Sequence, residues 1–320
     1  MSSIDKSEKA YEEILSKLDI LRLTPKQSEK IIEIKKIGSG GFGKVMSGTY
    51  LTLPIAIKKM KNFKFEDFYR EINVIRQFRH IYVPNLYFIL NEKKKNINII
   101  SELIKGKTLD DYIKRTKPSD LQLIVHLLDL STVLNHFHNF NLIHRDLKPS
   151  NVMIDQNLEL KLLDFGISKI TQNRSFTTTV AMGTILYMAP ENFDTQYLSG
   201  QTNSELSKTK ITGRVDVWAF GCIVSEIFSK CKPWTPIAND DTAVISHLFN
   251  KSEFPIPVKI TNVKIRKLIE NCTKVMECDR YNFHMVNISL REILCDLVKE
   301  RKLEDFNDNH KYLKDELSFL

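Results

Sequence analysis

A glycine-rich stretch near the start of the chain, IGSGGFGKV at residues 37–45, limits what this sequence can fold into. Gly38, Gly40 and Gly43 follow the pattern G-x-G-x-x-G, in which the missing Cβ atoms let backbone N–H groups approach the phosphates of a nucleotide. Dinucleotide-binding folds begin a helix directly after the third glycine, whereas other nucleotide-binding folds place the glycines in a β-hairpin. The residues that follow decide between these two structures.

After Gly43 the sequence continues as KVMSGTY, residues 44–50, with β-forming residues and another glycine, which is a poor start for a helix. We therefore expect strand, turn and strand. A third strand, IAIK at residues 55–58, follows, and side-chain alternation along it puts Ala56 and Lys58 on one face. A small residue beside a lysine suits an adenine pocket with an ammonium group that reaches the phosphates.

Short β-branched runs and apolar residues at helical spacing predict the remaining elements. Strands are expected within residues 31–60 and over 86–90 and 97–100, and helices over 8–21, 66–77, 216–230, 262–274 and 288–300. Two capping-box patterns, T-x-x-D from Thr108 and S-x-x-Q from Ser119, mark further helix starts. The second precedes an apolar stripe: Leu121, Ile124, Leu128, Leu134 and Phe137. Strands first and helices later predict an α+β chain with a small β-rich lobe followed by a larger α-helical lobe.

Composition narrows the class of protein. The 320 residues are 42% hydrophobic and carry a net charge of +8, but no basic cluster is interleaved with aromatic residues, so a nucleic-acid partner is not expected. The five cysteines form no C-x-x-C pair, which argues against a zinc site or a disulfide framework; Cys222 and Cys295 are expected in the core. No run reaches the roughly 18 apolar residues of a membrane span. We expect a cytoplasmic protein, and a nuclear location is compatible with the same features.

Three further motifs occur in a set order: HRDLKPSN at residues 144–151, DFG at 164–166 and APE at 189–191. Together with the glycine stretch and Lys58, they resemble the eukaryotic protein kinases over about residues 31 to 300. The resemblance implies the bilobal protein kinase fold with an ATP cleft between the lobes. It divides the chain as follows: extension 1–28 with a short amphipathic helix, kinase domain 29–300 (N-lobe 29–100, hinge 101–106, C-lobe 107–300) and tail 301–320.

The resemblance also implies roles for the residues in these motifs. Asp146 would orient the hydroxyl group of a protein substrate, and Lys148 would neutralise the γ-phosphate of ATP. Asn151 and Asp164 would bind Mg²⁺, a hard cation that prefers oxygen ligands. Lys58 would hold the α- and β-phosphates.

Two more residues support this machinery by the same resemblance. Glu71 matches the family's ion-pair partner of Lys58; Glu66 is a competing choice but lies too early in the helix pattern. Thr184, which follows Gly183 ahead of the APE motif, resembles the threonine that bridges Asp146 and Lys148.

The expected ATP site combines the glycine stretch with the strand and hinge residues. Ser101 resembles the residue at the back of the adenine pocket and is small for that position, so we expect an enlarged pocket. Backbone groups of Glu102 and Ile104 would bind adenine. The full set is Ile37, Gly38, Ser39, Gly40, Gly41, Phe42, Gly43, Val45, Ala56, Lys58, Ser101, Glu102, Ile104 and Met153.

Three features are expected around the catalytic motif in the C-lobe. By the same resemblance, Asp216 would anchor the backbone of the HRD loop, and Glu191 would pair with Arg280. The polar stretch 195–212 reads as an insertion near the substrate face.

The predicted activity is ATP-dependent transfer of phosphate to serine or threonine of a protein, since Lys148 and the Gly183-Thr184 pair resemble serine/threonine kinases. Arg145 implies control by phosphorylation of the segment that holds Ser175, Thr177, Thr178 and Thr179. The alternatives are a nucleotide-binding pseudokinase scaffold, a dual-specificity kinase and a kinase-like enzyme for small molecules. Nothing in the sequence selects an oligomeric state.

Overall fold

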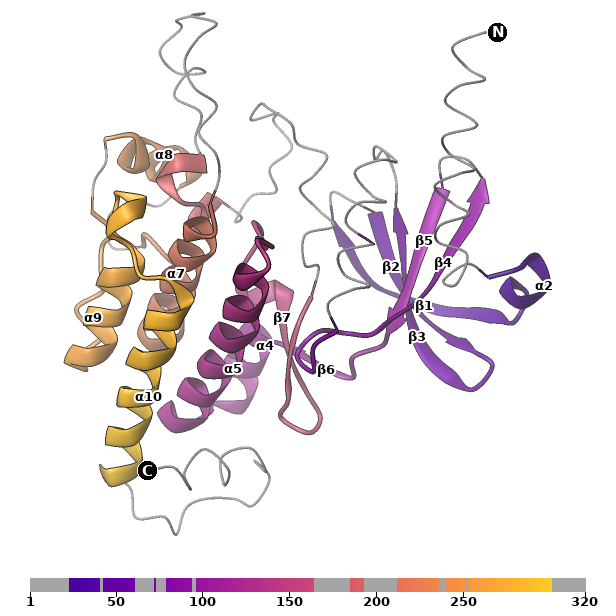
Figure 1. Ribbon diagram of the computed structural model, residues 1–320, viewed down its shortest axis with the longest axis horizontal. Helices are drawn as coiled ribbons and strands as arrows, with labels where there is room; N and C mark the ends of the chain where they lie inside the picture. The colour runs from indigo at the N-terminus through magenta and orange to yellow at the C-terminus, as the bar shows by residue number, and fades with distance from the viewer. Residues whose placement is uncertain are drawn as a thin grey trace, which may run out of the picture. The chain divides into compact units, whose positions relative to one another are not determined.

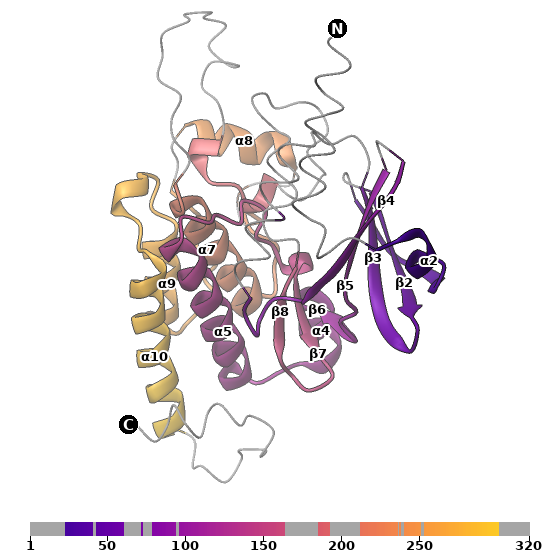
Figure 2. The same cartoon turned by 45° about the vertical axis from the view of Figure 1, so that its right-hand side comes forward.

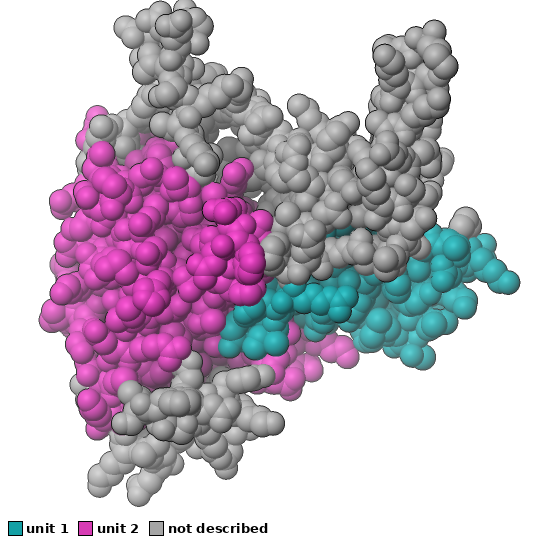
Figure 3. All heavy atoms as spheres, viewed as in Figure 1, with its two compact units in different colours: residues 1–104, 164–174 teal, residues 105–163, 175–320 magenta. Residues whose placement is uncertain are grey.

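The computed structural model describes the following residues: 23–40, 43–60, 72, 79–93, 96–163, 185–192, 212–235, 237, 240–250 and 253–300. The chain divides into two compact units between Ile104 and Lys105 (Figure 3). The first contains residues 1–104 and 164–174, and the second contains residues 105–163 and 175–320.

The first unit is built on one antiparallel sheet of five strands in the order β1-β2-β3-β5-β4 (Figure 1). The elements are the short helix α2 (Pro25–Ser28) and the strands β1 (Ile31–Gly40), β2 (Gly43–Tyr50), β3 (Leu53–Met60), β4 (Leu86–Lys93) and β5 (Asn96–Glu102). The predicted strands are thus confirmed. Of the predicted helix 66–77 only Ile72 is described, in a helical conformation, and the predicted helix 8–21 lies outside the described residues.

One face of this sheet carries a cluster of buried isoleucines. Ile55 and Ile57 of β3 and Ile100 of β5 are buried together with Leu23. Ala56 and Lys58, between and after the two isoleucines, are only half-buried, as strand alternation requires. The Ala56–Lys58 face is buried further along, at Met60 of β3 and at Ile99 of β5, which lies opposite Lys58.

The glycine stretch is a β-hairpin, which settles the choice posed by the sequence. Strands β1 and β2 pair antiparallel across it, with Gly40 opposite Gly43. Gly43 has φ +137°, and a Cβ atom there would lie 1.8 Å from the carbonyl oxygen of Lys59. Only glycine fits this position, because the neighbouring strand β3 approaches its Cα directly.

The second unit is mostly helical. Its small antiparallel sheet contains β6 (Gly106–Thr108), β7 (Val152–Asp155) and β8 (Leu160–Leu162). Its α-helices are α4 (Leu109–Thr116), α5 (Asp120–Asn139), α7 (Arg214–Ser229), α8 (Asp241–Phe249), α9 (Val263–Cys272) and α10 (Phe283–Glu300). Short 3-10 turns are η2 (Pro149–Asn151), η3 (Ile185–Tyr187), η4 (Pro190–Asn192) and η5 (Glu277–Asp279).

Helix α5 follows its sequence signals closely. Ser119 accepts a hydrogen bond from the N–H of Gln122, and the Gln122 side chain accepts one from the N–H of Ser119, so the capping box is complete. All five residues of the predicted apolar stripe are buried. At the start of α4, by contrast, only the Thr108 side chain caps, accepting from the N–H of Asp111.

Helix α7 lies at the centre of the helical unit. In Figures 1 and 2, α7 packs beside α9 and α5 beside α10. Its residues Trp218 and Phe220 are completely buried, and the Phe220 ring meets the Phe283 ring edge-on at 5.6 Å. Cys222 is buried as predicted, whereas Cys295 of α10 is only half-buried.

Within the described ranges, all five cysteines are free, and no helix is long and apolar enough to cross a membrane. The expected insertion 195–212 lies outside those ranges except for Thr212.

Candidate active site

The HRD loop of the second unit is anchored to α7 through Asp216, as predicted. The Asp216 carboxylate accepts hydrogen bonds from the backbone N–H groups of His144 and Arg145, both at 2.8 Å. Arg145 adopts φ 64°, a left-handed conformation that costs a non-glycine residue about 1–2 kcal/mol. The two hydrogen bonds to a buried charge hold the loop in this strained conformation.

A second residue, His138 of α5, completes the surroundings of Asp216. Its Nε2 lies 2.8 Å from Asp216 Oδ2, and Gly213 leaves room for the ring, because a Cβ there would lie 2.6 Å from it. Burial would raise the pKa of Asp216, but its hydrogen bonds with His138 and the Arg145 amide hold the pKa below its ordinary value. Our reading of the sequence missed His138, because its only signal is a histidine in the last turn of a helix.

His144 fixes the next part of the loop. The N–H of Asp146 lies 3.2 Å from its Nδ1, and its Nε2 lies 3.0 Å from the carbonyl oxygen of Leu163. A carbonyl only accepts and an N–H only donates, so both contacts together require a neutral imidazole protonated on Nε2. The fully buried ring thus ties the loop to the end of β8.

The structure brings together two predicted catalytic side chains, Asp146 and Lys148, and the predicted magnesium ligand Asn151. Lys148 Nζ lies 3.1 Å from Asp146 Oδ2. The side-chain amide of Asn151 donates to the Asp146 carbonyl oxygen at 2.7 Å and to Asp146 Oδ2 at 3.1 Å. One oxygen of Asp146 is therefore held by an ammonium and an amide, which fixes the direction of the carboxylate.

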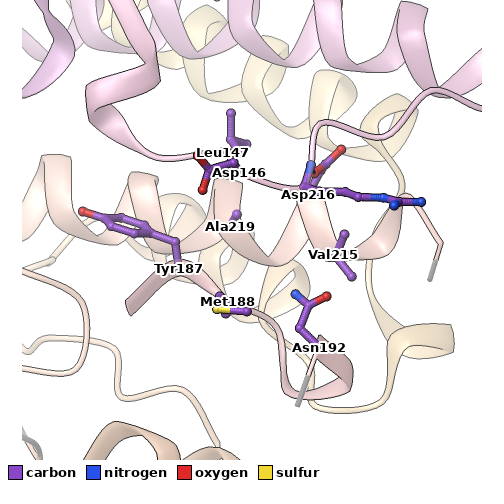
Figure 4. A pocket seen from close by; sticks show the side chains of 9 residues that line it. Asp146, Leu147, Tyr187, Met188, Asn192, Val215, Asp216 and Ala219 are labelled. Carbon is purple, nitrogen blue, oxygen red and sulfur yellow. Dashed lines mark hydrogen bonds between the residues drawn. The ribbon is translucent and has the colours of Figure 1, made fainter. Parts of the chain in front are cut away.

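Asp146 and the anchoring Asp216 line one pocket, shown in Figure 4. Its walls are the HRD loop, the segment 185–192 and the first turns of α7; Tyr187, Met188 and Asn192 represent the segment in the figure. The segment that carries the APE motif therefore lies beside the catalytic loop within one unit.

The end of that segment is held by the predicted pair of Glu191 and Arg280. The contact is bidentate, with Nη1–Oε1 at 2.5 Å and Nη2–Oε2 at 2.7 Å. Arg280 is 2% exposed, donates to the carbonyl oxygens of Lys274 and Val275, and lies over the Trp218 ring at 4.9 Å. Every part of this buried guanidinium has a partner, so the pair locks the segment to the helical core.

In the first unit, strand register gathers four predicted nucleotide-site residues. Val45 lies opposite Lys58, and Ala56 lies opposite Ser101. Directly opposed residues of antiparallel strands share a face, and Ala56 shares its face with Lys58. The four side chains therefore lie on the sheet face opposite to that of Ile55, Ile57 and Ile100. Lys59 points elsewhere and pairs with Glu33 at 2.6 Å.

The hinge residues are partly engaged within the sheet. The N–H of Glu102 donates to the Asn85 carbonyl at 2.9 Å, and its carboxylate accepts from Asn85 Nδ2 at 3.1 Å. Ile104, the other hinge residue, is half-buried at the end of the first unit.

The remaining predicted residues are distributed as follows. Ile37 and Gly38 lie in β1, and Ser39 and Gly40 contribute backbone to its end. Met153 lies in β7 of the second unit, opposite Thr108. Outside the described residues are Gly41, Phe42, Glu71, Asp164 and Thr184.

A glycine hairpin beside a strand lysine and a fixed aspartate–lysine–asparagine loop define a nucleotide-dependent phosphotransferase of the two-lobed class. The chain belongs to the protein kinase domain family, whose model matches residues 31–289. This confirms the resemblance and the α+β bilobal fold expected from the motifs. Phosphotransfer from ATP to protein is the general activity of that family.

Several curated proteins are similar to this chain. Probable serine/threonine-protein kinase kinX of Dictyostelium discoideum is 30% identical over 303 residues, covering 87% of this chain and 26% of the relative. Dual specificity protein kinase shkD of the same organism is 28% identical over 298 residues, 90% of this chain and 37% of the relative. Serine/threonine-protein kinase STY17 of Arabidopsis thaliana is 27% identical over 270 residues, 81% of this chain and 44% of the relative. The chain thus spans less than half the length of each of these three relatives.

Proposed function

We propose that this chain is an ATP-dependent protein kinase that phosphorylates serine and threonine hydroxyl groups. The observation that carries the proposal is the orientation of the Asp146 carboxylate by Lys148 and Asn151, in a loop anchored on Asp216. A pseudokinase that only binds nucleotide has no need of a fixed carboxylate at this position.

In the proposed reaction, Asp146 accepts a hydrogen bond from the substrate hydroxyl and aims its oxygen at the γ-phosphorus of ATP. The new O–P bond forms as the bond to ADP breaks, and the hydroxyl proton leaves toward the carboxylate. Lys148, 3.1 Å from Asp146, would balance charge on the transferring phosphoryl group. Positioning and charge balance are the main contributions that such a reaction needs from a protein.

The donor chemistry at Asn151 fits a magnesium ion. Its amide nitrogen makes both contacts with Asp146, which assigns the amide oxygen to the other side. The N–H of Leu163 donates to the Asn151 carbonyl at 2.7 Å, so Leu163, the residue before Asp164 in the sequence, lies beside Asn151. Asn151 and Asp164 would hold the ion, which neutralises phosphate charge when bound.

On the nucleotide side, Lys58 would hold the α- and β-phosphates and pair with Glu71. Val45 and Ala56 would cover the adenine, and Ser101 would leave space behind it. Support comes from the strand register, which puts these strand residues on one sheet face.

Serine/threonine specificity is supported by Lys148, by the Gly183-Thr184 pair and by the names of two of the relatives. The relative shkD is named a dual specificity protein kinase, so dual specificity is the alternative that the experiment must distinguish. We further propose a cytoplasmic location and activation by phosphorylation in the segment that contains Thr178 and Thr179. Support for that regulation is Arg145, which is exposed beside the catalytic aspartate and suited to grip a phosphate.

The test is incorporation of label from radioactive ATP into dephosphorylated α-casein, followed by phosphoamino-acid analysis. Asp146→Asn keeps the shape of the side chain and should lower turnover by roughly 10²–10⁴-fold. The matched control is Asp120→Asn, an exposed acid in the first turn of α5, which should leave turnover unchanged. Equal label with Asp146→Asn and wild type would contradict the catalytic assignment, and phosphotyrosine in the product would establish dual specificity.

A further inference from the structure

The loop that follows α7 reaches across to the segment beside the catalytic loop. Helix α7 ends at Ser229, its C-cap residue Lys230 has φ 57°, and the chain then turns back through Lys232 to Trp234. Trp234 is fully buried, and its indole N–H donates to the carbonyl oxygen of Leu186 at 3.2 Å. This contact ties the loop to the backbone of η3.

A second connection runs through a cluster of four polar side chains: Asp110, Tyr187, Glu226 and Lys232. The Tyr187 hydroxyl donates to Glu226 Oε2, and Lys232 Nζ contacts Glu226 Oε1. Lys232 also lies 3.2 Å from Asp110 Oδ2 and 3.4 Å from the Tyr187 hydroxyl. The ammonium of Lys232 is thus the one cation that the described residues place on Glu226.

Burial makes this arrangement depend on charge balance. Tyr187 is 6% exposed, and the Glu226 side chain is 11% exposed. Burial raises the pKa of Glu226, while its contacts with Lys232 and Tyr187 work in the opposite direction. Burial and the neighbouring Glu226 also raise the pKa of Tyr187, so the hydroxyl keeps its proton and remains a donor.

We propose that Lys232 is a positioning residue for phosphoacceptor binding: it balances the Glu226 charge that holds Tyr187, and so keeps the segment 185–192 in place beside Asp146. The inference rests on the proposed function, because it assigns this segment to contact with the acceptor protein. Tyr187 also lines the pocket that contains Asp146 (Figure 4). Displacement of its ring would change that surface without touching the nucleotide-side residues of the first unit.

The first experiment removes the positive charge of Lys232 but keeps an unbranched aliphatic side chain. In Lys232→Met, Glu226 loses its cation in a mostly buried site, and the KM for dephosphorylated α-casein should rise about tenfold. The KM for ATP and kcat should stay within about twofold, because the Asp146 contacts are untouched. Lys232→Arg keeps a cation on both carboxylates and should behave as wild type.

The matched control is Lys114→Met. Lys114 pairs with the same Asp110 at 3.7 Å but is largely exposed, and it makes no contact with Glu226 or Tyr187 in the described structure. The Lys114→Met variant also removes a positive charge from beside Asp110 and should leave the KM for casein unchanged. An equal rise of the KM for casein in Lys114→Met and Lys232→Met would show that the effect comes from surface charge alone, and would overturn the inference.

A double variant separates charge balance from loss of a side chain. In Glu226→Gln/Lys232→Met, the amide oxygen still accepts from Tyr187 and no buried charge remains, so the KM for casein should return to within about threefold of wild type. The positioning role of Lys232 would be refuted if the KM for casein did not rise in Lys232→Met. It would also be refuted if kcat, ATP affinity and melting temperature all fell together in that variant.

Hydrogen exchange of the 185–192 amides tests the inference even if wild type transfers no phosphate. Exchange should be faster in Lys232→Met and restored in the double variant. Inactive wild type with that exchange pattern would overturn the proposed function alone, and unchanged exchange would overturn the role of Lys232.

Discussion

Replacing Asp216 by asparagine tests whether a buried charge holds the catalytic loop. The wild-type carboxylate is 1% exposed and accepts from two backbone N–H groups, at 2.8 Å each, and contacts His138. Hydrogen bonds to a charged group contribute about 1.5–3 kcal/mol each. An asparagine has one accepting oxygen, so its NH₂ group would face one of the two backbone donors. We expect a loss of about 3–5 kcal/mol in the free energy of unfolding.

The assay is urea unfolding of wild type and Asp216→Asn, monitored by circular dichroism. Kinase activity toward casein as the substrate is measured in parallel. Activity should fall as well, because the loop then loses one of the two backbone hydrogen bonds that hold Arg145 at φ 64°. Asp120→Asn is the control, since Asp120 also lies in the first turn of a helix but is exposed. It should lose only the helix-dipole interaction, about 0.3–1 kcal/mol.

The pH dependence gives the result that would refute this reasoning. The pKa of Asp216 is held below 3.8 in the folded protein, so its contribution is present above that pH and is lost as pH falls through the folded value. The difference in unfolding free energy between wild type and Asp216→Asn should therefore not shrink between pH 8 and about pH 5. A difference under about 1 kcal/mol, or one that disappears by pH 6, would show that the charge does not anchor the loop.

Three further predictions concern other parts of the site. Gly43→Ala forces a Cβ against the Lys59 carbonyl, so the KM for ATP should rise and the free energy of unfolding should fall by about 1–3 kcal/mol. Nucleotide titration and thermal unfolding measure the two effects, and unchanged values of both would contradict the close approach of β3 to Gly43. Glu191→Gln leaves Arg280 buried without its counter-charge and should cost about 3–5 kcal/mol in urea unfolding, with a loss under 1 kcal/mol arguing against the lock. Ser101→Phe should weaken a bulky ATP-site inhibitor by at least about tenfold, because Ser101 lies opposite Ala56; equal inhibition of both proteins would exclude an enlarged pocket.

Local sequence signals predicted the elements that depend on neighbouring residues. The glycine hairpin follows from the glycines and the β-forming residues after Gly43, and the start of α5 follows from a capping box of four residues. The five-residue stripe of α5 is buried because its spacing matches the helical repeat. Such signals are readable because the interacting residues lie within one or two turns of each other.

Motif resemblance went further and predicted contacts between distant residues. It paired Glu191 with Arg280 and assigned Asp216 to the backbone of the HRD loop, and both contacts are present. It could not place His138, whose contact with Asp216 spans 78 residues, because a lone helical histidine carries no sign of its partner.

The cluster around Lys232 was decided by the tertiary structure alone. Its members come from α4, η3, α7 and the loop after α7, and Lys232 and Asp110 are 122 residues apart. Nothing periodic or local in the sequence links a surface lysine to a tyrosine of another segment. The sequence by itself determined the strand and helix pattern and the identity of the catalytic motif, because short-range spacing and side-chain chemistry encode both. Only the packing of helices against one another could decide which buried charges meet, because burial is what makes a charge require a partner.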